Sequence, residues 1–265
     1  MLKIAHVLNV TEIDGTKRAS YLHIAQPVTM RTMLLAKGVA SGKVSVDLVA
    51  VKHKNEKVDI APGFVVAPDF DSYAHDHLPE LKASGVEKPL PRLADILLAA
   101  SAAPDADYVI YTNLDIGLYA DFYLKVAGLI QAGHDAFCIN RLDLPKTYDG
   151  IVIDESNFEL AYFVEPVPHR GIDCFIFKSE YLPKLNLGNV YVGFPPIGQV
   201  LKTQIERCAG NFIWIKEGRF TFHLGSDEAW TRDKSGYHAA NDEAARGLYS
   251  SCFPESPSTS GRSRQ

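Results

Sequence analysis

The order of apolar segments is the feature of this sequence that most constrains its fold. Short strand-like runs alternate with segments of helical spacing through the first 140 residues. The strand-like runs are 3–10, 44–51, 108–112 and 136–140, and the helical segments are 28–40, 92–103 and 120–132. This alternation predicts a single α/β domain in which helices flank a mainly parallel central sheet. The C-terminal half is more mixed, with strands expected at 174–177, 212–215 and 220–223, and a helix at 197–209.

Composition allows a buried core and excludes several classes of partner. Of the 265 residues, 46% are hydrophobic and 22% are charged, as in ordinary globular proteins. The formal net charge of −5 gives no general attraction to nucleic acid or anionic lipid. No apolar run approaches the roughly 20 residues of a transmembrane helix, and the first residues lack the apolar stretch of a signal peptide. We therefore expect a soluble, cytoplasmic protein without a transmembrane segment.

Two further patterns indicate structure rather than chemistry. The four cysteines are far apart and form no C-x-x-C pair, which predicts buried free thiols rather than a zinc site or a disulfide framework. His75, Asp76 and His77 lie in the irregular stretch 52–90 with no third ligand in register, so we interpret them as part of a solvated loop. The Pro- and Ser-rich segment 254–265 predicts a disordered tail after a domain that spans 1–253.

Chemistry is expected at the end of the strand in "YVIYTNLDIGL", residues 108–118. Asn113 and Asp115 follow this apolar run and are two residues apart, so their side chains share one face of an extended backbone. Ligands of open α/β sheets bind beyond the carboxyl ends of the strands. A carboxylate and an amide oxygen there suit a hard divalent cation that neutralises a departing diphosphate. Alternatively, the two residues serve only as turn or capping residues.

The wider segment "DADYVIYTNLDIGL" resembles the Asp-x-Asp strand of GT-A fold glycosyltransferases. Asn113 stands where that family often has its first Asp, and Asp115 matches the second, which is the usual direct metal ligand. The resemblance implies a GT-A-like domain that binds Mn²⁺ or Mg²⁺ and a UDP- or GDP-linked sugar donor.

A second segment, "FTFHLGSDEAW", resembles the C-terminal His segment of several GT-A families. The resemblance implies that His223 completes the metal site with Asp115 and Asn113, and that Trp230 contacts the substrate. One retaining family has the pattern H-x-x-G-x-x-K-P-W; here the Gly comes one residue earlier and no Lys precedes the Trp. The phosphate contact of that Lys is then expected from Arg232 or Lys234.

The third segment is "HRGIDCFIFKSEYL", residues 169–182, which resembles the Gly-led segment that lines the sugar and acceptor pocket in GT-A enzymes. Gly171 allows close approach of the backbone to the donor sugar. Asp173 is a candidate catalytic base or sugar ligand, with Glu165 as the other candidate base, unless Asp173 only caps a turn. His169 and Arg170 are candidates for contact with the diphosphate or with an acceptor carboxylate.

Nucleotide binding is expected at the N-terminal strand, "HVLNV". By resemblance, the backbone around Val7 bonds the base, and Asn9 or Thr11 lies near the ribose. Arg92 either contacts the nucleotide or is a solvated surface charge. The nucleotide-binding half is then about 1–118 and the acceptor half about 119–253.

We therefore expect a metal-dependent, hexosyltransferase-type glycosyltransferase that transfers a sugar to a carbohydrate or small-molecule acceptor. Two alternatives remain open. A sugar-phosphate nucleotidyltransferase shares much of the architecture, although residues 11–20 hold few of the Gly and basic residues that its phosphate loop needs. A catalytically inactive nucleotide- or sugar-binding protein of the same fold is suggested by Asn113 in place of Asp.

Overall fold

The computed structural model describes residues 1–13, 21–78, 81, 89–224 and 236–252. Within these residues, the strands of the main sheet follow the order β3-β2-β1-β4-β9-β6-β11-β5, and β10 also pairs with β6. The strands are β1 (Leu2–Asn9), β2 (Val44–Val51), β3 (Phe64–Val66), β4 (Tyr108–Thr112), β5 (Ile116–Leu118), β6 (Ala136–Leu144), β9 (Val167–Lys178), β10 (Phe212–Ile215) and β11 (Thr221–Leu224). Most neighbours are parallel, whereas β9 runs antiparallel to both β4 and β6, and β5 antiparallel to β11.

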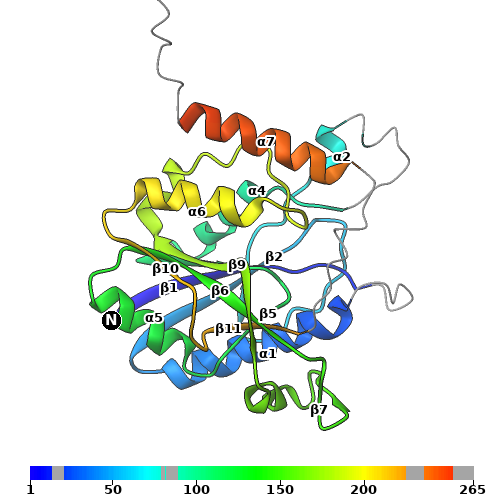
Figure 1. Ribbon diagram of the computed structural model, residues 1–265, viewed down its shortest axis with the longest axis vertical. Coiled ribbons are helices and arrows are strands. Elements are labelled where there is room, and N and C mark those ends of the chain that lie inside the picture. Colours follow the sequence, from blue (N-terminus) through cyan, green and yellow to red (C-terminus); the bar gives the residue numbers. More distant parts are fainter. Residues whose placement is uncertain (14–20, 79–80, 82–88, 225–235, 253–265) are drawn as a thin grey trace, which may run out of the picture.

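Helices cover both faces of this sheet, as Figure 1 shows. On one side lie α1 (Leu22–Ala40) and α5 (Phe122–Gln131), and on the other lie α4 (Leu93–Leu98), α6 (Ile197–Cys208) and α7 (Tyr237–Cys252). Each side has its own apolar core. None of the helices in the described part of the chain combines the length and apolar character that crossing a lipid bilayer requires.

The two cores follow from the alternation of side chains along each strand. In β1, Ala5 and Val7 face the core under α4 and α6, whereas Ile4 and Leu8 face the core over α1 and α5. Successive side chains of a strand point to opposite faces, so a strand buried on both sides reads as a continuous apolar run. This explains why the central strands were visible as apolar runs in the sequence.

Smaller elements complete the description. They are α2 (Ala74–His77), the hairpin β7 (Thr147–Tyr148) and β8 (Ile151–Val152), and the 3₁₀ helices η1 (Ala99–Ala102), η2 (Phe158–Phe163) and η3 (Ser179–Lys184). The predicted loop at His75–His77 is wrong in detail, because these residues form α2, in which the Asp76 carboxylate accepts a hydrogen bond from the Tyr73 backbone N–H at 2.9 Å.

The expected α/β architecture with a mainly parallel sheet and a more mixed C-terminal half is confirmed, and it matches a GT-A-like domain. Free thiols are confirmed at Cys138 and Cys174, which are buried, and at Cys208. Two strands are longer than predicted: β6 continues to Leu144 and β9 begins at Val167. The domain limits 1–253 stay a prediction, and the predicted tail 254–265 lies outside the described residues.

Candidate functional site

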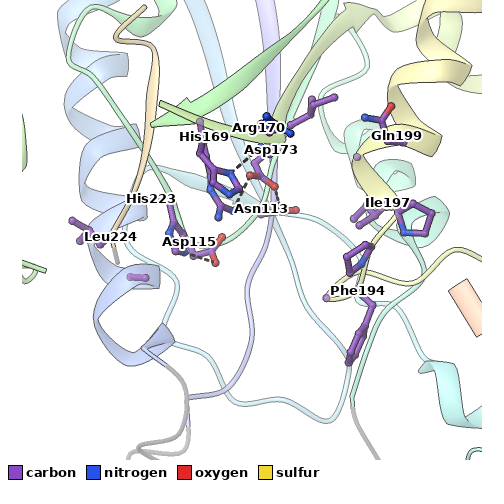
Figure 2. A pocket seen from close by; sticks show the side chains of 18 of the residues that line it. Asn113, Asp115, His169, Arg170, Asp173, Phe194, Ile197, Gln199, His223 and Leu224 are labelled. Carbon is purple, nitrogen blue, oxygen red and sulfur yellow. Dashed lines mark hydrogen bonds and ion pairs between the residues drawn. The ribbon is translucent and has the colours of Figure 1, made fainter. Parts of the chain in front are cut away.

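A cavity of about 550 Å³ opens at the edge of the sheet where the parallel strands end. The segment after β4 contributes Asn113 and Asp115, β6 contributes Arg141, and β11 contributes His223. Because β9 is antiparallel to β4 and β6, its N-terminal half lies at this same edge and brings His169–Asp173 to the cavity. The topology therefore gathers polar side chains that are far apart in sequence (Figure 2).

Asp115 and His223 form the first cluster. The Nε2 atom of His223 lies 3.4 Å from Oδ2 of Asp115, and its Nδ1 atom lies 3.7 Å from Oδ1 of Asp143. The sheet sets this geometry, because His223 is opposite Ile116 in antiparallel β5 and beside Asp143 in parallel β6. The imidazole is therefore held between two carboxylates, one of which faces the cavity.

Asp173 is the centre of the second cluster. Its Oδ1 atom accepts a hydrogen bond of 2.7 Å from the amide of Asn113, and its Oδ2 atom accepts one of 3.0 Å from Nη1 of Arg141. The same guanidinium donates from Nε to Oδ1 of Asp143 at 2.9 Å. The side-chain oxygen of Asn113 accepts a hydrogen bond from the Tyr111 hydroxyl at 3.0 Å. Asn113 is thus oriented with its NH₂ group toward Asp173.

Burial and these contacts shift the pKa values of Asp115 and Asp173 in opposite directions. Burial raises the pKa of Asp173, and the Asp115 carboxylate adds to the rise, while Arg141 opposes it. Burial alone would also raise the pKa of Asp115, but the hydrogen bond and charge of His223, together with Arg141, bring it below the ordinary value. Asp115 is therefore held as a carboxylate, and Asp173 is the more basic of the two.

The residues present fit a divalent cation that is shared with a ligand. The site holds three carboxylates, of Asp115, Asp143 and Asp173, but among the residues that the structure describes Arg141 is the only permanently charged cation that contacts them. Two ligands bound to one metal ion at about 2.1 Å lie roughly 3 Å apart, close to the separation of Asp115 and His223. Among the described residues, no three His, Cys, Asp or Glu side chains converge as a complete metal site. Some divalent ions take only one or two protein ligands and complete their shell with phosphate and water.

Another part of the cavity wall is lined by Phe194, Pro195, Pro196 and Ile197. Helix α7 contacts this segment through Asn241 and Tyr237. The buried side chain of Asn241 accepts a hydrogen bond from Tyr191 N–H and donates to the carbonyl oxygens of Tyr191 and Phe194, at 2.8–3.0 Å. The ring of Phe194 also stacks on Tyr237. The C-terminal helix thereby fixes the segment that shapes the cavity.

Three residues predicted to bind the nucleotide do not line the cavity. Val7 is fully buried in the core, and Asn9 is 6% exposed, with its amide bonded to the carbonyl oxygens of Val10 and Val51. Thr11 donates a hydrogen bond to Glu56 at 2.8 Å, outside the lining of the cavity. None of these three side chains joins the cluster around Asp115.

Arg92 and Glu165, two further predicted site residues, also lie outside the cavity lining. Arg92 makes a two-pronged ion pair with Asp95 at 2.8 Å, and the side chain of Glu165 is 91% exposed beside Arg219. Trp230, Arg232 and Lys234 lie outside the described residues.

Arg141 and Asp143 are members of the charged cluster that were not predicted from the sequence. The predicted strand stopped at residue 140, where the apolar run ends, although β6 continues to Leu144. The available signal was the alternation in Arg141-Leu142-Asp143-Leu144, in which Leu142 and Leu144 are buried in one apolar cluster. A strand of this pattern places Arg141 and Asp143 together on the other face.

Comparison with known proteins gives distant structural matches. No protein-family model and no curated protein matches the sequence. Residues 1–349 of Staphylococcus aureus TarS, solved with UDP-GlcNAc, match with a TM-score of 0.46 and 10% identity, over 97% of this chain and 74% of that one. Glucosyl-3-phosphoglycerate synthase from Mycobacterium tuberculosis, solved with Mn²⁺, UDP and phosphoglyceric acid, matches with a TM-score of 0.49 and 15% identity. This match covers 93% of this chain and 79% of that one.

A third match is a putative glucose-1-phosphate thymidylyltransferase from Bacillus anthracis, with a TM-score of 0.42 and 10% identity, over 92% of this chain and 95% of that one. Similarity at this level assigns neither an activity nor a residue to this chain.

Proposed function

We propose that this protein is a metal-assisted glycosyltransferase that transfers a sugar from a nucleoside diphosphate sugar to an acceptor hydroxyl. The observation that carries the proposal is the pairing of Asp115 with His223 at 3.4 Å, on the wall of an open cavity and next to a second carboxylate, Asp173. These residues come from three different segments of the chain, yet they meet where a parallel sheet binds ligands.

In this proposal Asp115 and His223 hold Mn²⁺ or Mg²⁺, with Asn113 beside them. The ion, when bound, neutralises the negative charge that builds on the departing nucleoside diphosphate. Asp115 is suited to this role because it stays ionised, and His223 because its ring is oriented between two carboxylates. Asn113 contributes mainly by holding Asp173, since its NH₂ group donates to that carboxylate.

Asp173 takes the role of proton acceptor. The bond between the anomeric carbon and the diphosphate oxygen breaks, and its electron pair leaves with the nucleoside diphosphate. The acceptor oxygen bonds to the sugar and its proton passes to the Asp173 carboxylate. Each oxygen of Asp173 accepts one hydrogen bond and keeps a further lone pair for this hydroxyl. Glu165, which is exposed and outside the cavity, has no part in this step.

The test is product analysis with a panel of UDP- and GDP-linked sugars and Mn²⁺. Release of nucleoside diphosphate, lost in Asp115→Asn and strongly reduced in Asp173→Asn, is the expected result. Formation of pyrophosphate and a nucleotide sugar from a nucleoside triphosphate and a sugar 1-phosphate would instead identify a nucleotidyltransferase. Tight binding of a nucleotide sugar with no turnover would identify a binding protein.

A further inference from the structure

The pairing of β9 with β6 contains extra residues where β9 borders the cavity. Ile139 is opposite Cys174 and Asn140 is opposite Ile172, so Asp173 is an additional residue on β9. The next recorded partners are Leu142 and Pro168: β6 advances two residues while β9 advances four. Such bulges redirect side chains away from the regular ladder and are frequent beside active sites. The additional length of β9 therefore presents His169, Arg170 and Gly171 to the cavity.

Backbone contact fixes the ring of His169. Its Nδ1 atom accepts a hydrogen bond of 2.8 Å from the N–H of Gly171, so Nδ1 carries no proton and Nε2 carries one. A Cβ atom at position 171 would lie 2.8 Å from this Nδ1 and 3.0 Å from Oδ2 of Asp173. Glycine is thus required for the ring to fold back over the backbone. The structure makes His169 a hydrogen-bond donor through Nε2.

Arg170 differs from the other arginine of the cavity. Arg141 is 18% exposed and is paired with two carboxylates, whereas Arg170 is exposed and has no carboxylate within ion-pair distance in the described part of the chain. Its charge is therefore available to a bound anion. An arginine fork matches carboxylate and phosphate groups, which accept two parallel hydrogen bonds.

The position of Arg170 separates it from the proposed diphosphate site. Figure 2 shows Asn113 and Asp173 between the Asp115–His223 pair and Arg170. A diphosphate bound beside Asp115 and His223 thus lies on the other side of Asp173 from Arg170. The part of the cavity wall that faces Arg170 is formed by Phe194, Ile197 and Gln199, and none of these three side chains is charged.

We propose that His169 and Arg170 form an anion subsite that binds a carboxylate or phosphate group of the acceptor. The description of this ligand as an acceptor rests on the proposed function. The substrate class is then a hydroxylated acid, whose anionic group is held by Arg170 and by Nε2–H of His169. Its hydroxyl is directed toward Asp173, which lies three residues further along the same strand.

The test compares neutral compounds with their acids in calorimetric titrations. The probes are glycerol, glycerate and glycerol 3-phosphate, and glucose, glucuronate and glucose 6-phosphate. In at least one set the acids are expected to bind the wild type more tightly than the neutral compound. Arg170→Gln is expected to weaken binding of those acids about tenfold, as for loss of one charge-assisted contact. Arg246→Gln, a change of an exposed arginine on α7 outside the cavity lining, is the matched control and leaves binding unchanged.

UDP with Mn²⁺ is the second arm, because a donor diphosphate offers the same chemistry as an acceptor phosphate. Arg170→Gln is expected to leave UDP binding within about twofold of the wild type, well under the tenfold change for one charged contact. The proposal would be overturned if Arg170→Gln weakened the binding of UDP and of the acids equally. It would also be overturned if the acids bound the wild type no more tightly than the neutral compounds in either set. If the acids bind through Arg170 and no nucleotide binds, the anion subsite stands and the proposed transferase function fails.

Discussion

Arg141 Nη1 lies 3.0 Å from Oδ2 of Asp173 while its Nε lies 2.9 Å from Oδ1 of Asp143, so one guanidinium connects the two carboxylate clusters of the cavity. Charge thus alternates along Asp115, His223, Asp143, Arg141 and Asp173 when the imidazole is protonated. The burial and the two hydrogen bonds of Arg141 make it the residue on which the geometry of the site depends.

Replacing Arg141 should therefore cost stability as well as activity. Arg141→Gln leaves Asp143 and Asp173 without their cation, and we expect a loss of about 3 kcal/mol in the free energy of unfolding. Arg141→Lys keeps the charge but not the fork that spans two carboxylates, so it should recover only part of this loss. Urea denaturation measures both. The control is Arg219→Gln, which removes an exposed ion pair with Glu165. For this change we expect a loss of less than about 1 kcal/mol in the free energy of unfolding.

Gly171 should not tolerate a side chain, although it adopts no left-handed conformation. Gly171→Ala places Cβ against His169 and Asp173, and we expect a loss of about 1–3 kcal/mol with reduced sugar transfer. Gly128→Ala is the matched control, because nothing lies within 4 Å of a Cβ there, in α5. That change should stabilise the protein by about 0.5–1 kcal/mol. Equal effects of the two changes on thermal unfolding would contradict the packing described for Gly171.

Stability on the acid side should depend on His6, which is fully buried between Tyr123 and Thr112. Burial lowers the pKa of His6 from 6.5 to about 3. Between these values the unfolded chain binds a proton that the folded chain does not. Stability should thus fall as the pH decreases through this window, by about 1.4 kcal/mol per pH unit from this group. His6→Gln should flatten the dependence, and an unchanged slope in denaturant titrations would show that His6 charges within the fold.

The contact between α7 and the cavity wall offers a further prediction. Asn241→Ala removes three buried hydrogen bonds to the N–H of Tyr191 and the carbonyl oxygens of Tyr191 and Phe194, which should cost about 2 kcal/mol in the free energy of unfolding. Because Phe194 lines the cavity, we also expect a higher KM for the acceptor. His238→Ala, on the half-exposed side of the same helix, should change stability by less than about 0.5 kcal/mol. Equal effects of the two changes would mean that α7 does not support the wall.

The fold was largely predictable because its central strands are buried on both faces. The strands at 108–112 and 212–215 agree with the sequence prediction residue by residue, and the helix at 197–209 to within one residue. Helix α1 begins at Leu22 rather than near residue 28, because Pro27 lies inside the helix and not at its start. Helix α7 was not predicted, since its apolar residues are few and its Asn241 is buried through hydrogen bonds.

Part of the candidate site could be predicted from polar residues that end an apolar run or that resemble a known segment, whereas polar residues that continue a strand beyond its apolar run were missed. Asn113 and Asp115 were proposed because an apolar strand precedes them, and His223 because residues 220–230 resemble the C-terminal His segment of GT-A families. Arg141 and Asp143 were missed because the apolar run ends at residue 140, whereas the strand continues to Leu144 through alternating polar and leucine residues. The bulges that present His169 and Arg170 depend on the register between β9 and β6, which one strand alone does not specify.

The central claim is a divalent ion held by Asp115 and His223, and calorimetric binding of UDP and GDP with and without Mn²⁺ tests it most directly. We predict that one of these nucleotides binds only when Mn²⁺ is present, that Asp115→Asn and His223→Gln abolish this dependence, and that His75→Ala, outside the cavity lining, preserves it. Nucleotide binding of equal strength with and without Mn²⁺, or unaltered metal dependence in Asp115→Asn, would contradict the account.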